Sequence, residues 1–552
     1  MFCLKKMIAL LTVFSMGTGL LAGCGGVSKD ETPQDASSNR SGMAKEQVIR
    51  YNIGTEPETL DPHKATGMTE GTILASLFEG LTRYDKDGKT ITPGIAEKWE
   101  MSTDGLKYTF HLRNAKWSNG AAITAQDFEY SWKRALDPKV ASEYAYQLFY
   151  LKNAEAYNSG RLMDASHVGV KATNAKTLEV ELHTPAPQFM GLTAFQTLYP
   201  LNQKVVEANP EKWYQDPNTL VSNGPFKLVK WNNRQSVELA KNAAYWDANT
   251  VKLQKLIYTL IDAEDTVLIM FETGQIDMAM NPPRPELDRL QKAGDLTITP
   301  QLSTYFYRFN VTKKPFDDVR VRKALAMSID REAIVKSITR AGERPATAFV
   351  PYGIQDANPA KDYRSVGGSL LTQWDAAQAK KLLAAAGYPE GKGFPTTSIL
   401  YNNDQQHAKI AQAIQEMWKK NLGIDVQLIN QEWQVYLDNE DKLAYDIARA
   451  GWSGDYVDPM TFMDLFVTKG GNNDTGWSNA EYDKAIQSAN NTFDPKVRMN
   501  AMHKAENILM NQLPIMPIYF YTQPYLVNSK VTDVVLPSFG TYGDFKWAWL
   551  AE

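Results

Sequence analysis

The chain has 552 residues, a length that suggests three or four domain-sized units. Hydrophobic residues make up 43% and charged residues 22%, which excludes a wholly disordered chain and a polytopic membrane protein. The 59 lysines and arginines against 63 aspartates and glutamates give a net charge of −4, so the chain lacks the basic character that nucleic-acid binding requires.

The first residues predict an export signal. Lys5 and Lys6 precede an uncharged apolar run over residues 7–22, which is short for a permanent membrane span. The run ends in Leu-Ala-Gly-Cys24, which resembles the lipobox of bacterial lipoproteins, whose cysteine is lipidated as the signal is removed. We therefore expect residues 1–23 to be a signal peptide and Cys24 to carry lipid chains. The alternative is an ordinary signal peptide with an incidental cysteine.

The segment after the signal predicts a tether. The chain has two cysteines, and because Cys3 leaves with the signal, Cys24 would be the only thiol of the mature chain. A chain of this length can bury several cores and needs no disulfide. Residues 25–44 contain no aromatic residue, so we expect 24–44 to be a lipidated flexible tether. The twenty residues 25–44 would span roughly 25 Å as a coil.

Strand and helix patterns alternate from residue 47 onward. In chain order they predict a strand over 48–53, a hairpin turn over 85–88, a strand over 106–113, a helix after a capping box of Thr124 and Asp127, a strand over 178–182, helices over 319–338, 376–386 and 405–421, a strand over 424–429 and a helix over 496–513. No short repeat is visible, which argues against a solenoid. This order predicts a multi-lobed α/β fold.

Motifs of enzymatic sites are absent from the sequence. The six histidines form no HExxH pair, and no GxSxG nucleophile motif occurs. The expected lipid on Cys24 would exclude a cysteine nucleophile. We therefore expect no enzyme activity, no metal and no cofactor. The 13 tryptophans, 26 tyrosines and 21 phenylalanines suit a ligand cleft, although most of them must form the core.

Several segments carry a family resemblance. They are 56–63 (EPETLDPH), 77–81 (LFEGL), 115–120 (AKWSNG), 127–132 (DFEYSW), 222–226 (SNGPF), 316–322 (FDDVRVR), 431–433 (QEW) and 449–456 (RAGWSGDY). Together with the lipobox they resemble the oligopeptide-binding lipoproteins of ABC importers, a branch of the extracytoplasmic solute-binding proteins. The resemblance covers nearly the whole mature chain.

The resemblance implies two opposed lobes joined by a hinge, with an extra lobe on the first. By this resemblance lobe I would comprise 45–78, 203–305 and 522–552, the extra lobe II would comprise 79–202, and the opposed lobe III would comprise 306–521. This is the periplasmic-binding-protein type of fold in its peptide-binding form.

An enclosed peptide needs partners for its ammonium, its carboxylate and its backbone groups, because unpaired buried polar groups are costly. By the resemblance, Asp455 matches the aspartate that holds the α-ammonium, and Arg449 matches a basic residue for the carboxylate. Gly451, Trp452 and Ser453 match a strand that pairs with the ligand backbone by β-augmentation. Six residues of extended chain separate the two charges by up to ~20 Å. Alternatively, Asp455 only shapes a turn and Arg449 forms an ordinary salt bridge.

The resemblance also implies contacts from other segments. Thr66, Gly67 and Met68 match a second strand edge opposite the first. Tyr144 matches a tyrosine that hydrogen-bonds the ligand as the lobes close.

Three further residues match pocket-lining positions: Trp433, Asn402 and His407. Each also has an ordinary interpretation, because Trp433 suits a core, Asn402 a turn and His407 a helix surface.

Two departures from some relatives are visible. Glu440 and Arg308 stand where some members carry a base and an acid, which could change the preference for peptide length or charge. Ser303 and Ser453 stand where some members have a cysteine pair, and the fold should not depend on that bridge.

The resemblance therefore implies a lipid-anchored, monomeric receptor on the outer face of the cytoplasmic membrane. It would capture short peptides and deliver them to ABC permease subunits with associated ATPases, and it would not bind nucleic acid. Alternatives within the class are a dipeptide, a cell-wall peptide, a signalling peptide or a nickel complex as ligand. A surface hydrolase, chaperone or adhesin remains the alternative from other classes.

Overall fold

The computed structural model describes residues 42–371 and 374–552, and residues 42–552 form one structural unit. The predicted signal peptide, Cys24 and most of the predicted tether lie outside the described residues. The tether prediction is wrong at its end, because residues 42–44 pair with the C-terminus. Met43 forms a β-bridge with Ala551, and the Ala44 amide donates to the Leu550 carbonyl at 2.9 Å.

One large mixed sheet organises the described part of the chain. Its strands, in spatial order, are β15 (Val426–Gln431), β14 (Thr397–Asn402), β16 (Ile447–Ser453), β12 (Leu296–Phe309), β17 (Ile515–Val527), β11 (Met278–Met280), β1 (Val48–Asn52), β10 (Lys255–Thr259), β9 (Ser236–Lys241) and β8 (Phe226–Asn232), and β13 (Arg344–Pro345) pairs with β17. The sheet thus combines chain segments that are hundreds of residues apart.

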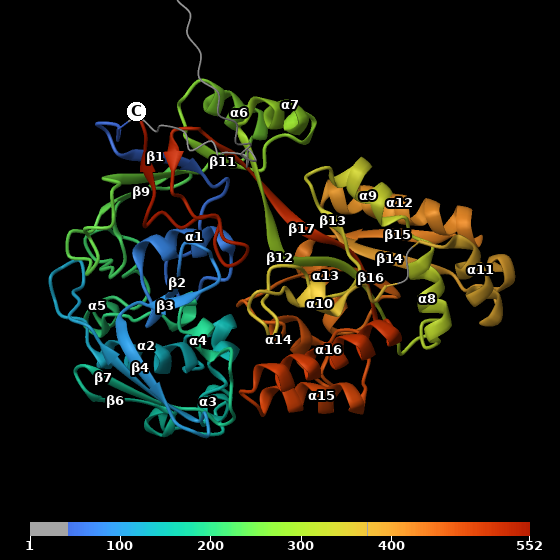
Figure 1. The fold of residues 1–552 in the computed structure, drawn as a ribbon, viewed down its shortest axis with the longest axis horizontal. Coiled ribbons are helices and arrows are strands. Elements are labelled where there is room, and N and C mark those ends of the chain that lie inside the picture. The colour runs from blue at the N-terminus through green and yellow to red at the C-terminus, as the bar shows by residue number, and fades with distance from the viewer. Residues whose placement is uncertain (1–41, 372–373) are drawn as a thin grey trace, which may run out of the picture. The chain divides into compact units, whose positions relative to one another are not determined.

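Two long strands, β12 and β17, run through both halves of this sheet (Figure 1). Residues 296–300 of β12 pair with 522–526 of β17, and residues 304–308 pair with 515–520. The register shifts between Pro300 and Thr304, so the ladder is interrupted midway. The predicted lobe boundaries at 305/306 and 521/522 fall within these two strands, and the assignment of ranges to lobes stays a prediction.

Smaller sheets complete the strand content of the described residues. They are a four-stranded sheet of β4 (Ala96–Met101), β5 (Lys107–Leu112), β7 (Thr177–Glu181) and β6 (Val170–Asn174), and the pairs β2 (Thr82–Tyr84) with β3 (Ile91–Pro93) and β18 (Val531–Thr532) with β19 (Trp549–Leu550). The turn predicted at 85–88 joins β2 to β3, and Gly88 there has a φ of 66°.

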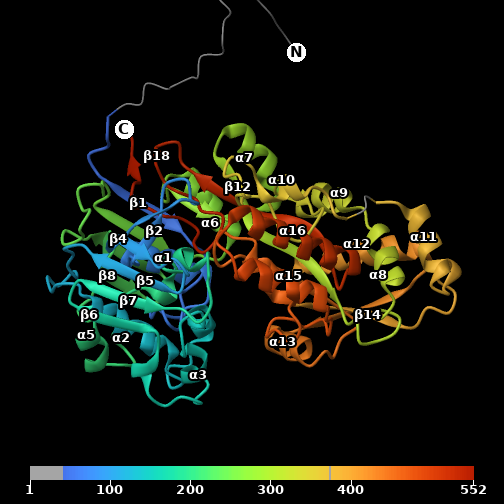
Figure 2. The ribbon, with the colours of Figure 1, turned by 60° about the horizontal axis from the view of Figure 1, so that its bottom comes forward.

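The helices are mostly short. Those before β12 are α1 (Met68–Leu77), α2 (Ala125–Leu136), η1 (Glu143–Leu148), α3 (Ala154–Asn158), η2 (Ala165–His167), α4 (Phe189–Leu192), η3 (Gln196–Leu198), α5 (Gln203–Ala208), α6 (Glu264–Glu272), η4 (Arg284–Glu286) and α7 (Leu287–Ala293). Those after it are α8 (Val319–Met327), α9 (Arg331–Ile334), η5 (Val335–Thr339), α10 (Tyr363–Gly367), α11 (Ala376–Ala385), η6 (Pro389–Gly391), α12 (Gln405–Leu422), α13 (Trp433–Asp441), α14 (Met460–Met463), η7 (Asp464–Phe466), α15 (Ala480–Asn490) and α16 (Pro495–Gln512). Figures 1 and 2 show α15 and α16 side by side.

Most predicted elements are present, and the predicted capping box of Thr124 and Asp127 begins α2. The single helix predicted over 319–338 is wrong. Ser328 caps the end of α8, and the Asp330 side chain accepts from the Ala333 amide at 2.9 Å to begin α9. The strand predicted over 424–429 begins and ends two residues later, as β15. The chain leaves α12 through the cap at Gly423 before the strand begins.

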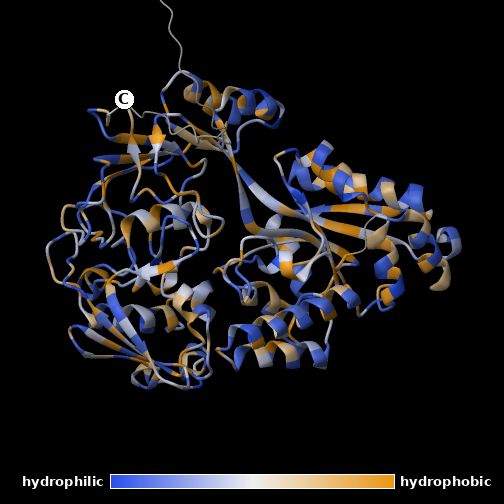
Figure 3. Cartoon of the chain, viewed as in Figure 1, coloured by the Kyte–Doolittle hydropathy of each residue, from blue (hydrophilic) through white to orange (hydrophobic). Residues whose placement is uncertain are grey.

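Large aromatic side chains fill the core, as expected. Trp117, Trp132, Trp213 and Trp418 are among the largest fully buried side chains. Figure 3 shows hydrophobic and hydrophilic residues alternating along the helices and strands. Trp433 is an exception, because half of its surface is exposed.

Candidate ligand-binding site

The free edge of β16 is the centre of the candidate site. β16 pairs along its whole length with β12, but it pairs with β14 only at Ile447 and Ala448. The Arg449 carbonyl lies on the side away from β12, where it accepts a hydrogen bond from the Tyr436 hydroxyl. Because alternate residues direct their amide and carbonyl groups to the same side, those of Gly451 and Ser453 face this free edge.

Both residues are exposed, as an edge that receives a ligand strand must be. Trp452 lies between them, is half-buried and pairs with Thr304 of β12. Ser303 donates to Ser453 at 2.7 Å across the two strands, so a hydrogen bond occupies the position of the cysteine pair of some relatives.

Asp455 lies two residues beyond the end of β16 and marks one end of the edge. Its backbone is fixed by a 3.0 Å hydrogen bond from its amide to Thr461, and its carboxylate accepts a 3.4 Å hydrogen bond from the Tyr146 hydroxyl. Tyr144 lies nearby, with its ring 5.8 Å from that of Tyr146 and 5.2 Å from that of Phe195. The structure thus brings the predicted Tyr144 to Asp455, but the donor is Tyr146, two residues further on.

Asp455 has no cationic partner among the described residues. Burial raises the pKa of its carboxyl to about 7, although hydrogen bonds from Gln147 and Tyr146 favour the charged form. Asp464 lies close enough that burial, Asp455 and Asp458 together raise its pKa to about 8. Asp458 itself is neutralised by Arg498 at 2.7 and 2.8 Å. This end of the edge therefore favours a cation.

Arg449 marks the other end of the edge and carries the opposite charge. Its guanidinium donates to the Tyr521 hydroxyl at 2.9 Å and to Asn402 at 3.5 Å, and it lies 4.9 Å from the centre of the Tyr305 ring. No carboxylate within the described residues forms an ion pair with it. A half-buried cation surrounded by neutral groups favours an anionic ligand.

His407 and Trp433 lie at the same end. The His407 ring is 5.5 Å from that of Tyr305, and burial together with the Arg449 charge lowers its pKa to about 4, so the ring is neutral at pH 7. Trp433 begins α13 and stacks on Tyr436 at 5.6 Å with half of its surface exposed. The prediction that these residues and Asn402 line one pocket agrees with their grouping around Arg449 and stays a prediction.

Arg308 and Glu440, the first of the two departures from some relatives, belong to one buried ion cluster. Arg308 donates to Glu440 at 2.7 Å and contacts Asp474 at 2.9 Å. The guanidinium is thus shared by two carboxylates, and neither Arg308 nor Glu440 offers an unpaired charge to a ligand. Arg449, by contrast, is a cation of this region without an acidic partner in the part of the chain that the structure describes.

Thr66, Gly67 and Met68 do not form a strand. Thr66 and Gly67 are exposed in an irregular segment, and Met68 begins α1. The expectation of a regular second strand edge is therefore wrong for this conformation, since the helix starts where that strand would be. The role of these residues toward a ligand stays a prediction.

A buried polar network holds this segment in place. Asp61 accepts from Arg134 at 2.7 and 3.1 Å, and the same guanidinium lies 2.8 Å from His63 Nδ1. Burial and the Arg134 charge lower the pKa of His63 to about 3, so its ring is neutral and bonds Ser131 at 3.0 Å. The DPH motif therefore anchors the segment before Thr66 to α2.

The site consists of an exposed backbone edge between the Asp455 carboxylate and the Arg449 guanidinium, neither of which has an ionic partner among the described residues. Asp455 lies six residues after Arg449, which allows a separation of at most about 20 Å along an extended chain. Within the described residues, no group of His, Cys, Asp or Glu is arranged to hold a metal. An extended zwitterion with backbone amides fits this arrangement.

Sequence reasoning missed several residues at the two charges. Tyr146 and Gln147 lie at Asp455, while Tyr305, Tyr436 and Tyr521 surround Arg449. The only signal in the sequence was proximity, because Tyr146 is two residues from Tyr144 and Tyr436 is three from Trp433.

The chain is similar to known proteins along most of its length. Residues 90–474 match the family model of bacterial extracellular solute-binding proteins, family 5. The oligopeptide-binding protein OppA of Bacillus subtilis is 42% identical over 544 residues, covering 97% of this chain and 98% of that protein. The structure of the Escherichia coli murein tripeptide binding protein MppA has a TM-score of 0.78 and 36% identity, covering 92% of this chain and 99% of that one. Haemophilus influenzae OppA in complex with the peptide RPPGFSPFR has a TM-score of 0.75 and 34% identity, covering 93% and 100%.

Proposed function

Because the chain belongs to family 5 of the bacterial extracellular solute-binding proteins, which serve ABC importers, we propose that it binds oligopeptides along the free edge of β16. The ligand's α-ammonium would meet Asp455 and its carboxylate would meet Arg449. The observation that carries the proposal is the pair of opposite, uncompensated charges at the two ends of one exposed strand edge.

The proposal follows from how a peptide loses water on binding. Its backbone amides must be paired when they are enclosed, and the groups of Gly451 and Ser453 offer that pairing without reading side chains. Its two terminal charges find opposite charges that are already half-buried, so charge-assisted hydrogen bonds form without breaking protein ion pairs. A bound peptide would contact Tyr146 on one side and β16 on the other. Binding would therefore favour a closed conformation of the two halves that β12 and β17 connect.

The test is calorimetric titration with a tetrapeptide and its N-acetylated form at pH 6.5, in two buffers of different ionisation enthalpy. Because burial raises the pKa of Asp455 to about 7, part of the unliganded protein carries a proton there at this pH. The ammonium requires the ionised carboxylate, so binding should release a fraction of a proton per peptide. Affinity should be highest near pH 7 to 8, since the peptide amine loses its proton above about pH 8.

The N-acetylated peptide is the matched control. It lacks the cation, so it should bind much more weakly and release no proton at pH 6.5. Equal affinity for both forms would contradict the role of Asp455, and binding without proton release would contradict its raised pKa. Absence of binding by any tetrapeptide would overturn the proposed function itself.

The proposal extends to a lipid anchor at Cys24 and delivery of the ligand to a permease with associated ATPases. The lipobox-like sequence supports the anchor. Among the described residues, no helix has the length and hydrophobicity of a membrane span. Several acyl chains on one cysteine would hold the protein at the outer face of the membrane.

Replacing Cys24 with Ser should move the protein from the membrane fraction to the soluble fraction in cell fractionation. Retention of the variant on membranes would contradict lipidation.

A further inference from the structure

A cavity of about 620 Å³ lies where the ladder between β12 and β17 is interrupted. Residues 298–301 of β12 and 520–522 of β17 line it. It shares Tyr521 with the surroundings of Arg449, but among the described residues that line it, none belongs to β16. Small-molecule sites in proteins typically have volumes of about 300–1,000 Å³. The cavity is therefore large enough for a ligand of its own, apart from the strand edge proposed for peptides.

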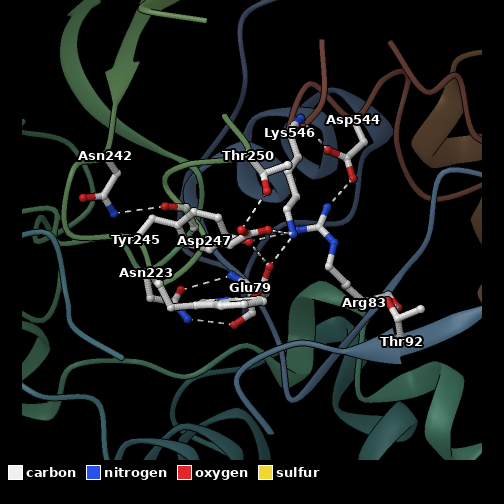
Figure 4. Close-up of polar contacts among 12 residues, drawn as sticks. Glu79, Arg83, Thr92, Asn223, Asn242, Tyr245, Asp247, Thr250, Asp544 and Lys546 are labelled. Carbon is white, nitrogen blue, oxygen red and sulfur yellow. Dashed lines mark hydrogen bonds and ion pairs between the residues drawn. The ribbon is translucent and has the colours of Figure 1, made fainter. Parts of the chain in front are cut away.

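Residues 86–89, in the turn between β2 and β3, form one wall of the cavity together with residues 534–538. Arg83 of β2 donates to the Asp544 carboxylate at 2.6 Å, as Figure 4 shows. The Asp544 backbone in turn forms a β-bridge with Val535 in the wall. These contacts join the turn to the C-terminal part of the chain, so the wall is in place without a ligand.

A second wall comes from β13 and the loop that follows it. Arg344 of β13 pairs with Phe520 of β17, and its guanidinium lies 5.2 Å from the centre of the Tyr352 ring. The rings of Tyr352 and Phe520 meet edge to face at 5.8 Å. This wall therefore places a guanidinium directly beside two aromatic rings.

Apolar side chains at the cavity are incompletely covered by the protein. Ile298 of β12 lines it, as do Val534 and Leu536 of the first wall, and each of the three is only half-buried. Pro300 also lines it and is exposed. Covering apolar surface that still contacts water is favourable in proportion to its area. The cavity therefore favours a ligand with an apolar body.

Cations outnumber carboxylates in the lining. The charged residues there are Lys86, Lys89, Arg344, Asp87 and Asp362. Lys86 lies 3.8 Å from Asp533, and both side chains are exposed, so this pair holds the lysine weakly. Neither Lys89 nor Arg344 forms an ion pair within the part of the chain that the structure describes. The lining thus carries one net positive charge and two cations that are free to meet an anion.

The two carboxylates of the lining are engaged by backbone amides. Asp87 accepts from the amides of Lys89 and Thr90, each at 2.8 Å, within its own turn. Asp362 accepts from the Gly353 amide at 2.8 Å and so shapes the second wall. Because their oxygens are used in this way, they offer little to the ammonium of a peptide. The cavity therefore differs in chemistry from the site at Asp455.

We infer that this cavity binds an amphiphilic monoanion, a carboxylate on an alkyl body. Arg344 would donate to the carboxylate, because a guanidinium matches that group with two parallel hydrogen bonds. Lys89 would add attraction from the other wall, and the alkyl body would cover Ile298, Leu536 and the aromatic pair. The inference does not depend on the proposed function, since it uses neither Asp455 nor Arg449.

The test is calorimetric titration with hexanoate, octanoate and decanoate at pH 7.5, where all three are ionised. Each added pair of methylenes should strengthen binding about fourfold, because the cavity covers the chain only in part. The matched ligands 1-octanol and octylammonium lack the anion and should bind at least about fivefold more weakly than octanoate. Methyl NMR should show shifts at Ile298 and Leu536 when octanoate is added.

Single substitutions locate the anion. Arg344→Gln should weaken octanoate binding about tenfold and remove its advantage over 1-octanol, and Lys89→Gln should weaken it about twofold. Both side chains are exposed, so the fold and the affinity for a tetrapeptide should be kept. Arg320→Gln is the matched control, because this exposed guanidinium contacts Asp318 at 2.6 Å and does not line the cavity.

Arg449→Met distinguishes this cavity from the peptide site. Octanoate should bind this variant as tightly as it binds the wild type. If octanoate binding is lost with Arg449→Met and kept with Arg344→Gln, the anion occupies the peptide site and the inference is overturned. Equal binding of octanoate and 1-octanol, or no binding of any alkyl carboxylate, would overturn it as well. None of these outcomes bears on whether tetrapeptides bind along β16.

Discussion

Replacing Asp455 with Asn is expected to weaken the binding of free-amine peptides by about 10²- to 10⁴-fold. The substitution keeps the size of the side chain and its hydrogen bond from Tyr146 but removes the charge that would neutralise the ammonium. The ammonium would then be half-buried without an anion, and a buried charge that has lost its partner strongly destabilises the complex. Calorimetry at pH 7.5 with a tetrapeptide and with its N-acetylated form measures the effect.

Asp464→Asn is the matched control for this prediction. Asp464 lies close enough to Asp455 for the two carboxyls to interact, but it is not placed on the strand edge. Removing it should keep peptide affinity within about threefold at pH 7.5, because a carboxyl whose pKa is raised to about 8 is mostly uncharged there and Asn keeps its size. Equal losses for free-amine and acetylated peptides with Asp455→Asn would indicate a structural role for the carboxylate instead.

The fold class and the family could be predicted from the sequence. The structure's likeness to solved peptide-binding proteins confirms the α/β binding-protein fold, and family membership agrees with the expectation of no enzyme activity. Elements with strong local signals were placed well. The capping box of Thr124 and Asp127 begins α2, and Gly423, with a φ of 71°, ends α12.

Segments in which two local signals conflict could not be assigned correctly from the sequence. Residues 319–338 have helical spacing throughout, but Ser328 and Asp330 are also good capping residues, and their side chains end one helix and begin another. Likewise, the Met68 segment resembles a strand edge by its motif, yet it starts α1. Periodicity alone cannot decide between a continuous helix and two capped ones.

The candidate site was predictable where one strand carries it. Asp455 and Arg449 lie on a single motif, so their spacing along the chain sets an upper limit on their separation. Their surroundings were not predictable, because Tyr146 is 309 residues away from Asp455 and Tyr521 is 72 away from Arg449. The pairing of Arg308 with Glu440, 132 residues apart, likewise depends on tertiary packing.

Arg449→Met should weaken the binding of peptides with a free carboxylate by about 30- to 1,000-fold, because a half-buried anion would lose its cation. Methionine keeps much of the apolar length of the side chain over the Tyr305 ring, so the pocket should stay filled. The loss of the guanidinium should also raise the pKa of His407, since the Arg449 charge lowers it now. NMR titration of that ring measures this shift independently of any ligand.

A peptide with a C-terminal amide separates binding from structure at this position. The wild type should bind the amide more weakly than the free acid, while Arg449→Met should bind the two about equally, because the partner of the carboxylate is already gone. Arg289→Met removes an exposed guanidinium that contacts Glu286 and Glu272, and it should keep the preference for the free acid. If Arg449→Met weakened acid and amide equally, the guanidinium would act only through Tyr521 and Asn402. The strand edge would then recognise a peptide by its amino end and backbone alone, and the protein would tolerate ligands of any length beyond Arg449.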